Sequence, residues 1–218
     1  MTPFLLVLSS PSGGGKSTIA QALLARRHDV GYSISATTRP PRPGERDGEH
    51  YRFLSRDAFL AARDAGAFAE WAEYNGQLYG TRHEELARIA AQGRHAVLDI
   101  DVEGARQLRR TMPGSVHVFI LPPSAAALAA RLRGRQSEAP AQVRQRLEHA
   151  AREVSAAAEY DYVIVNDDLD HAVQQVDAIV EAESRRAYRL ADLSGTLQEL
   201  RQAVETEARR YPAVNAGS

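Results

Sequence analysis

Short apolar runs alternate with longer amphipathic stretches along this chain of 218 residues. The apolar runs are rich in branched residues and are bounded by polar or turn residues, a pattern typical of buried parallel strands. Four strands are predicted, at Phe4–Leu8, Ala96–Ile100, Val116–Leu121 and Tyr162–Val165. Helical periodicity predicts helices at Ser17–Arg26, Val102–Thr111, Ala125–Arg133, Gln142–Ala158 and Leu169–Leu190. This alternation predicts an α/β fold, with a parallel sheet covered by helices on both faces.

The stretch from about Tyr32 to Gly93 breaks the alternation. It carries three prolines, several glycines and clustered aromatic residues before a helix predicted near Glu84–Ala91. We interpret it as a mixed α/β subdomain inserted into the core. Beyond Ala191, a polar amphipathic pattern predicts a tail helix with Ser194 as its N-cap, followed by an end that frays.

Composition narrows the class of protein. The length and the 44% hydrophobic content favour one compact unit with insertions. The formal net charge of -1 suggests neither a nucleic-acid partner nor a membrane surface, and no segment approaches the roughly 20 apolar residues of a membrane span. The first apolar run lacks a basic leader, so it indicates a strand and not a signal peptide. Without cysteine there are no disulfides or thiolate metal sites, which favours a cytoplasmic protein.

A glycine-rich segment, Ser10–Ser17, lies between the first predicted strand and helix. It reads Ser-Pro-Ser-Gly-Gly-Gly-Lys-Ser, and its position is the one that a phosphate-binding loop requires. Its backbone N–H groups would bind phosphate oxygens, Lys16 would reach the β- and γ-phosphates, and the Ser17 hydroxyl would ligate Mg²⁺. Ser10 stands where the usual pattern has its first glycine. A glycine-rich turn without a ligand is the alternative.

The lysine count supports the phosphate loop. Of the 27 basic side chains, Lys16 is the single lysine and the others are arginines. A compact ammonium fits inside a ring of backbone amides, whereas a guanidinium is larger and planar. The sequence therefore predicts that this loop binds a triphosphate, and that an arginine in place of Lys16 could not do so.

The inserted stretch carries candidates for binding a phosphate monoester. Arg39 and Arg42 lie three residues apart on a proline-stiffened segment, and two guanidinium groups can grip a phosphate bidentately. Tyr51 and Tyr79 offer phenol donors for the same phosphate. Each of these residues, taken alone, is more typical of an ordinary surface group, but the whole set is harder to explain in that way.

Glu70 is a candidate for reading a base. It lies in an alternating, strand-like segment in which Phe68, Glu70 and Ala72 are expected to point one way. A carboxylate accepts hydrogen bonds from adjacent N–H and N–H₂ donors, which guanine presents on its Watson–Crick edge. A carboxylate that faces solvent is the alternative.

Two further groups of charges have the spacing of functional residues. Asp99 and Asp101 share a face at the carboxyl end of a predicted strand, where parallel sheets bind ligands, and could position Mg²⁺ or form salt bridges. Arg131 and Arg135 lie four apart on one helix, and Arg146 follows in the next. An exposed basic helix face is the alternative for these arginines.

Seven segments now carry a resemblance. They are Ser12–Ser17, Ser35–Arg42, Gly48–Tyr51, Tyr79–Thr81, Leu98–Asp101 with Glu103 and Gly104, Arg131–Arg135, and Ile164–Asp168. In this order they closely resemble guanylate kinases of the bacterial and eukaryotic type, over about residues 3–188. Ser10 resembles a variant in bacterial members, while Gln136 stands where relatives usually carry glycine.

The resemblance implies the activity and the organisation of the chain. It implies a P-loop nucleoside monophosphate kinase that transfers the γ-phosphoryl group of ATP to GMP, and to dGMP, with Mg²⁺, in purine nucleotide recycling. Its parts would be a core (about 1–33, 94–124 and 159–190), a GMP-binding insertion (about 34–93), a helical lid (about 125–158) and a tail (191–218).

It also implies the roles of individual residues. ATP would be bound by Ser12, Gly13, Gly14, Gly15, Lys16, Ser17, Thr18 and Asn166. GMP would be bound by Ser35, Arg39, Arg42, Tyr51, Glu70, Tyr79, Gly80, Thr81 and Asp101. The catalytic charges would be Lys16, Arg131, Arg135 and Arg146, and Mg²⁺ would be held by Ser17 and Asp99, partly through water.

Two other functions remain open at this level. The same fold occurs as a non-catalytic interaction domain, although such domains lack an intact phosphate loop and are flanked by other modules. A kinase for another nucleoside monophosphate would differ at Ser35, Glu70 and Thr81. The sequence leaves the oligomeric state open, either monomer or homo-oligomer.

Overall fold

The centre of the molecule is a five-stranded parallel sheet, seen in a computed structural model that describes residues 2–74, 76–133 and 140–211. Every neighbouring pair of strands in it is parallel, which confirms the predicted fold class. From one edge to the other, its strands are β2 (Val30–Tyr32), β7 (His95–Asp99), β1 (Leu5–Ser9), β8 (Val116–Leu121) and β9 (Tyr162–Val165). Strand β2 was not predicted, because its three residues, with glycine at the centre, are too short for a periodic signal.

Helices pack on both faces of this sheet, as expected for parallel strands, although Val163 and Val165 of the edge strand β9 are exposed. On one face, Leu6 and Leu8 of β1 pack with residues of α1 (Lys16–Arg26) and α7 (Leu169–Ser184). On the other, Val7 packs with residues of α3 (His83–Ala91) and α4 (Val102–Thr111). Successive residues of β1 thus enter different clusters, which explains why the strand is one continuous apolar run in the sequence.

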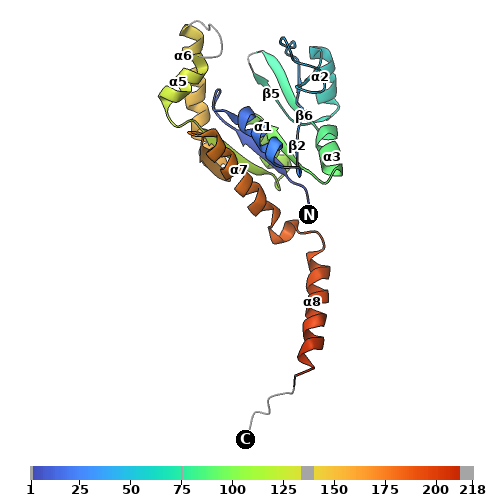
Figure 1. Cartoon of the computed structure of the whole chain (residues 1–218). Helices are drawn as coiled ribbons and strands as arrows, with labels where there is room; N and C mark the ends of the chain where they lie inside the picture. The colour runs from blue at the N-terminus through green and yellow to red at the C-terminus, as the bar shows by residue number, and fades with distance from the viewer. Residues whose placement is uncertain (1, 75, 134–139, 212–218) are drawn as a thin grey trace.

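The stretch that breaks the alternation forms a second, mixed sheet beside α2 (Figure 1). Helix α2 (Arg56–Asp64) begins at Ser55, whose hydroxyl accepts a hydrogen bond from the Ala58 N–H. Its buried Phe59 stacks on Phe68 with ring centroids 4.3 Å apart. The strands of this sheet, in spatial order, are β4 (Arg52–Phe53), β3 (Ala36–Thr37), β6 (Gln77–Arg82) and β5 (Phe68–Tyr74).

A pair of helices follows β8 and lies across from the second sheet (Figure 1). Helix α5 (Ala125–Arg133) packs on α6 (Pro140–Val154) through Leu128, Leu132 and Ala150. Helix α6 is shorter than predicted: the chain tightens into a 3₁₀ segment, Ser155–Glu159, before β9.

The C-terminal region differs from its prediction in two ways. Helix α7 ends at Ser184 and not at Leu190, and a 3₁₀ turn, Ala187–Arg189, follows it. Helix α8 (Leu193–Ala208) is capped by Asp192, whose carboxylate accepts from the Gly195 N–H, so Ser194 is a helical residue and not the N-cap. Helix α8 buries none of its residues and projects from the body (Figure 1). No helix in the described part of the chain is long and apolar enough to cross a membrane.

Candidate active site

Most of the residues predicted to bind ATP and Mg²⁺ meet at the carboxyl ends of the strands of the parallel sheet. Strand β1 ends at the glycine-rich loop, β7 ends at Asp99, and Asn166 directly follows β9. Parallel strands present their carboxyl ends together, and ligands of such sheets bind there. The fold therefore brings together residues that are as far apart in the sequence as Gly14 and Asn166, which are separated by 152 positions.

The glycine-rich loop has a conformation that only glycine tolerates at two positions. Gly13 and Gly15 have φ angles of 86° and 100°, and the Gly14 N–H donates to the Pro11 carbonyl at 2.8 Å. A Cβ on Gly15 would lie 2.3 Å from the Asn166 side-chain nitrogen. Helix α1 begins directly after Gly15, so Lys16, Ser17 and Thr18 occupy its first turn, where backbone N–H groups favour anions. Lys16 is half-buried and has no ion-pair partner among the described residues.

Two predicted ATP-side residues contact this loop. The Asn166 side-chain amide donates to the Gly14 carbonyl at 2.9 Å. The Arg131 guanidinium donates to the Gly14 carbonyl at 3.3 Å and to the Asn166 carbonyl at 2.9 Å. Helix α5 and the end of β9 are thereby attached to the same peptide group of the loop.

Helix α6 also contacts the loop, at Ser12. The Arg146 guanidinium donates to the Ser12 hydroxyl at 2.9 Å. The Ser12 N–H donates to a carboxylate oxygen of Glu153 at 3.1 Å. Arg146 was a predicted catalytic residue, whereas Glu153 was not predicted. Arg135 and Gln136 lie outside the described residues.

Oxygen atoms suited to a divalent cation gather at Asp99. The Ser17 hydroxyl donates to one oxygen of the Asp99 carboxylate, and the Tyr32 phenol donates to the other at 2.6 Å. Burial, together with the Asp99 charge, raises the pKa of Tyr32, so the phenol stays protonated. The described residues include no cluster of three or more His, Cys, Asp or Glu side chains that could hold a metal ion. A site with two protein oxygens fits Mg²⁺, which keeps several waters and binds phosphate oxygens.

The predicted acceptor-phosphate residues also lie together. The Arg39 guanidinium is 5.2 Å from the centre of the Tyr51 ring, and the Tyr51 and Tyr79 rings meet edge to face at 6.2 Å. Arg39 pairs with Glu45 at 2.8 Å, which raises the pKa of Arg39 and fixes the direction of its guanidinium. The Arg42 N–H donates to the same carboxylate at 2.7 Å, while the Arg42 side chain is exposed. Burial and the nearby Asp99 raise the pKa of Tyr51, which links this cluster to the candidate metal site.

Glu70 is buried, which excludes the alternative of a carboxylate that faces solvent. It is 4% exposed, and burial raises its pKa to about 7, with a smaller contribution from the charge of Asp101. Asp101 caps α4 by accepting from the Gly104 N–H at 2.8 Å. A Cβ on Gly104 would lie 2.5 Å from a Glu70 carboxylate oxygen, so the glycine leaves room for the carboxylate.

The second sheet places the remaining predicted acceptor residues around Glu70. Glu70 on β5 is paired with Thr81 on β6, and Ala36, which follows Ser35, is paired with Gly80. A Cβ on Gly80 would lie 2.8 Å from the Glu70 carbonyl oxygen, which accounts for glycine here. Ser35, Glu70, Gly80 and Thr81 thus come from neighbouring positions on three adjacent strands.

One local expectation about Glu70 is wrong. Phe68 and Glu70 do not share a face, because the pairing of β5 with β6 shifts between them and leaves one extra residue on β5. Phe68 packs with Phe59 and Trp71, whereas Glu70 lies on the other side, against Gly104. The bulge turns the carboxylate towards α4, and simple alternation could not reveal it.

Sequence reasoning missed three residues that shape the site: Tyr32, Glu45 and Glu153. Glu45 follows the two arginines that it contacts, and its opposite charge was a usable signal. Glu153 lies seven residues after Arg146 on one helix face, a spacing that was also legible. Tyr32 had no such signal, because its partner Asp99 is 67 residues away.

Comparisons with known proteins identify the family of this chain. The family model described as guanylate kinase matches residues 3–183. A guanylate kinase of Chelativorans sp. (strain BNC1) is 49% identical over 183 residues, covering 84% of each chain. One of Alcanivorax borkumensis is 44% identical over 197 residues, covering 90% of this chain and 95% of its own.

A solved structure shows the same fold. The crystal structure of guanylate kinase from Anaplasma phagocytophilum matches with a TM-score of 0.74 and 34% identity, covering 91% of this chain and 95% of that one. The family model extends over both sheets and the glycine-rich loop, and the two relatives cover 84% and 90% of this chain. The chain therefore belongs to the guanylate kinase family.

Proposed function

We propose that this chain transfers the γ-phosphoryl group of ATP to GMP, giving ADP and GDP, and that dGMP is also an acceptor. The observation that carries the proposal is the buried Glu70 in the second sheet, in a family member whose phosphate loop holds its single lysine. A triphosphate site and a site for a guanine base are what this reaction requires. Recycling of purine nucleotides in the cytoplasm is the corresponding physiological setting.

The proposed division of labour follows the two sheets and the helix pair. The parallel core, about 1–33, 94–124 and 159–190, positions the donor and the metal. The insertion, about 34–93, binds the acceptor. The helix pair, within about 125–158, acts as a lid over the triphosphate, and the tail from 191 lies outside the kinase unit.

On the donor side, the loop residues Ser12–Ser17 and Thr18 would hold the triphosphate through backbone N–H groups, with Lys16 at the β- and γ-phosphates. Asn166, attached to the loop through Gly14, would contact the adenine side. Ser17 and Asp99 would hold Mg²⁺, which neutralises charge on the phosphate oxygens when it is bound. The hydrogen bond from Tyr32 orients the Asp99 carboxylate for this purpose.

On the acceptor side, Arg39, Arg42, Tyr51 and Tyr79 would bind the GMP phosphate. Glu70 would accept from the guanine N1–H and N2–H₂ groups, with Ser35, Thr81 and Asp101 completing the base site and Gly80 allowing the close approach. The two oxygens of an ionised, buried Glu70 carboxylate would discriminate strongly against bases that lack these donors. Without the donors, the cost of removing the carboxylate from water is not compensated.

The chemistry asks for alignment and charge neutralisation. A phosphate oxygen of GMP is largely ionised at neutral pH, so its attack on the γ-phosphorus needs no general base. Lys16, Arg131 and Arg146 would neutralise charge that shifts towards the leaving ADP, and the same role is proposed for Arg135. Exclusion of water by the lid and the insertion would prevent hydrolysis of ATP.

A coupled assay that offers GMP, dGMP, AMP, CMP and UMP with ATP tests this function. We expect turnover with GMP and dGMP, and ATP hydrolysis without an acceptor to be slow. Preference for another base would contradict the guanine assignment. Absence of turnover with all five would favour a non-catalytic binding module, and rapid hydrolysis without GMP would contradict the role of the lid.

A further inference from the structure

Helix α6 contacts Ser12 of the phosphate loop at both its N–H and its hydroxyl group. The Ser12 N–H donates to Glu153 at 3.1 Å, and the Ser12 hydroxyl accepts from Arg146 at 2.9 Å. Two residues that are seven positions apart lie on the same face of a helix, about two turns from each other. One face of α6 therefore makes both contacts with Ser12. The Glu153 side chain is 11% exposed, and a largely buried carboxylate makes a strong, directional contact.

His149 connects these contacts with the second sheet. Its Nδ1 atom makes no hydrogen bond with the described residues, but it lies 3.3 Å from the Glu153 carboxylate oxygen that accepts from Ser12, a contact that is an ion pair when the imidazole is protonated. On its other side, its ring meets the ring of Tyr74 edge to face, with centroids 5.7 Å apart. Tyr74 is the last residue of β5, the strand that carries Glu70. The two rings therefore join the proposed acceptor-binding insertion to the proposed lid.

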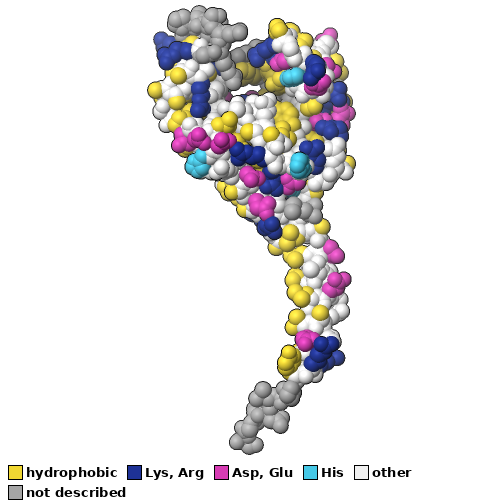
Figure 2. Space-filling view, in the orientation of Figure 1, with side chains coloured by type: hydrophobic (Ala, Val, Ile, Leu, Met, Phe, Trp, Pro, Cys, Tyr) yellow, Lys and Arg dark blue, Asp and Glu magenta, His cyan; other side chains and the backbone are white. Residues whose placement is uncertain are grey.

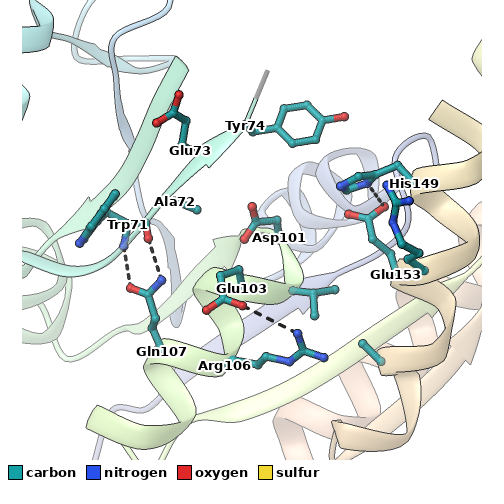
Figure 3. A pocket seen from close by; sticks show the side chains of 13 residues that line it. Trp71, Ala72, Glu73, Tyr74, Asp101, Glu103, Arg106, Gln107, His149 and Glu153 are labelled. Carbon is teal, nitrogen blue, oxygen red and sulfur yellow. Dashed lines mark hydrogen bonds and ion pairs between the residues drawn. The ribbon is translucent and has the colours of Figure 1, made fainter. Parts of the chain in front are cut away.

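The ring contact lies beside a cavity of about 460 Å³ between β5, α4 and α6 (Figure 3). In Figure 3, Tyr74 points from β5 across this cavity towards His149 and Glu153 on α6. Asp101, a proposed GMP contact, also lines the cavity. This cavity leaves room for β5 and α6 to change their separation. The two rings would transmit that change to the contacts of α6 with Ser12.

We propose that Tyr74, His149 and Glu153 form a relay that couples occupancy of the acceptor site to the position of the phosphate loop. The relay rests on the proposed function for the identity of its two ligands. When GMP orders the insertion, Tyr74 holds His149, and His149 holds the Glu153 carboxylate on Ser12. These three are positioning residues, because they act on ATP through Ser12 and touch no reacting atom.

A double-mutant cycle on ligand binding tests the relay. The affinity of a non-hydrolysable ATP analogue with Mg²⁺ is measured by titration calorimetry, with and without saturating GMP. In the wild type, we expect GMP to tighten the analogue several-fold, and linkage requires the reciprocal effect on GMP. Tyr74→Leu, His149→Leu and Glu153→Gln should each lower this coupling factor towards one. The Tyr74→Leu, His149→Leu double variant should lose no more than either single variant.

Glu148→Gln is the matched control, because Glu148 is an exposed carboxylate on α6 that pairs with Arg144. It should keep the wild-type coupling factor. The analogue affinity without GMP and the melting temperature identify variants that only weaken the fold, since a purely structural role moves these and leaves the coupling factor unchanged.

Three results would overturn the relay. The first is that GMP binds to the wild type without changing its affinity for the analogue. The second is that Tyr74→Leu or His149→Leu keeps the wild-type coupling factor. The third is that the losses of coupling in the two single variants add up in the double variant. Turnover of GMP by the wild type tests the proposed function separately. A wild type that turns GMP over while the ring variants keep its coupling factor refutes the relay alone, and failure to bind GMP refutes both.

Discussion

At the scale of single residues, Lys16 is the proposed contact of the β- and γ-phosphates. It lies in the first turn of α1, directly after Gly15, which has a positive φ angle, and backbone N–H groups at such a helix start favour anions. Arginine would keep the charge but would not fit inside a ring of backbone amides. Lys16→Arg should therefore lower kcat/KM by about a hundredfold or more, the usual effect of losing a group that stabilises the transition state.

The steady-state kinetics of Lys16→Arg need a control for arginine and lysine exchange in general. Arg133 is exposed at the end of α5, so Arg133→Lys should leave kcat/KM unchanged. Near-normal turnover of Lys16→Arg would refute the physical reason given for the single lysine.

If Glu70 binds the guanine base as proposed, binding of GMP should depend on pH. Burial raises its pKa to about 7, so below that pH the carboxyl is increasingly protonated and must ionise to accept from guanine. The KM for GMP should fall as pH rises from 6 to about 7 and then level off, with a limiting slope of about tenfold per unit. Initial rates over this range, with ATP saturating, measure the effect.

The phosphate of GMP titrates in the same range, so a variant must separate the two groups. Glu70→Gln binds the same phosphate but has no carboxyl, and its KM for GMP should be higher and lack the Glu70 step. If Glu70→Gln and the wild type share one pH profile, the step does not belong to Glu70.

The same raised pKa affects stability in the opposite direction. Between the ordinary value of 4.5 and about 7, the folded protein binds more protons at Glu70 than the unfolded chain does. The contribution of this group to the free energy of unfolding therefore falls as pH rises through that window. An ionised carboxylate is kept buried at a cost to stability, as expected of a functional residue.

At the scale of elements, α4 and β5 depend on each other through one glycine. Alanine at position 104 would be the better helix former by about 1 kcal/mol. Its Cβ would nevertheless lie 2.5 Å from the Glu70 carboxylate, which is buried and has little room to move. Gly104→Ala should raise the KM for GMP by about tenfold, or roughly 1.4 kcal/mol, and leave the KM for ATP unchanged.

Gly114→Ala is the matched control for that substitution. Gly114 lies between α4 and β8, and an added Cβ there meets nothing within 4 Å. Equal KM values for GMP in Gly104→Ala and the wild type would show that Glu70 can move aside without losing its contact with guanine.

At this scale, periodicity predicted the core strands and helices and the strand character of β5, but not the other strands around the acceptor site. Strands β3 and β4 have two residues each, too few for alternation to be visible. The bulge in β5 arises from pairing with β6, which no property of β5 alone reveals. The helix ends were displaced where the chain tightened into 3₁₀ turns, as at Ser155–Glu159.

At the scale of the whole molecule, α8 stands apart from the kinase body. Its hydrophobic side chains, including Leu197, Leu200 and Val204, are exposed along one side (Figure 2). Because α8 buries nothing, a chain that ends at Ala191 should keep its kcat and lose less than about 1 kcal/mol of stability. That corresponds to a melting temperature within about 2–4 °C of the full chain.

Leu23→Ala shows that the thermal measurement can detect a real loss. Leu23 is fully buried between α1 and the sheet, so this variant should lose about 2–5 kcal/mol. A truncated chain that melts as early as Leu23→Ala would show that α8 supports the fold in solution.

The sequence by itself determined the fold class and the family, and it predicted a phosphate loop and candidate site residues, most of which the structure brings close together. These depend on local patterns, namely apolar periodicity, glycines before a helix, and charges at short spacing. Only the tertiary structure decided the burial of Glu70, the partners of Asp99, and the contacts of Glu153 and Tyr74. Each depends on groups 30 to 141 positions apart, whose approach is set by strand pairing and helix packing and leaves no periodic signal in the chain.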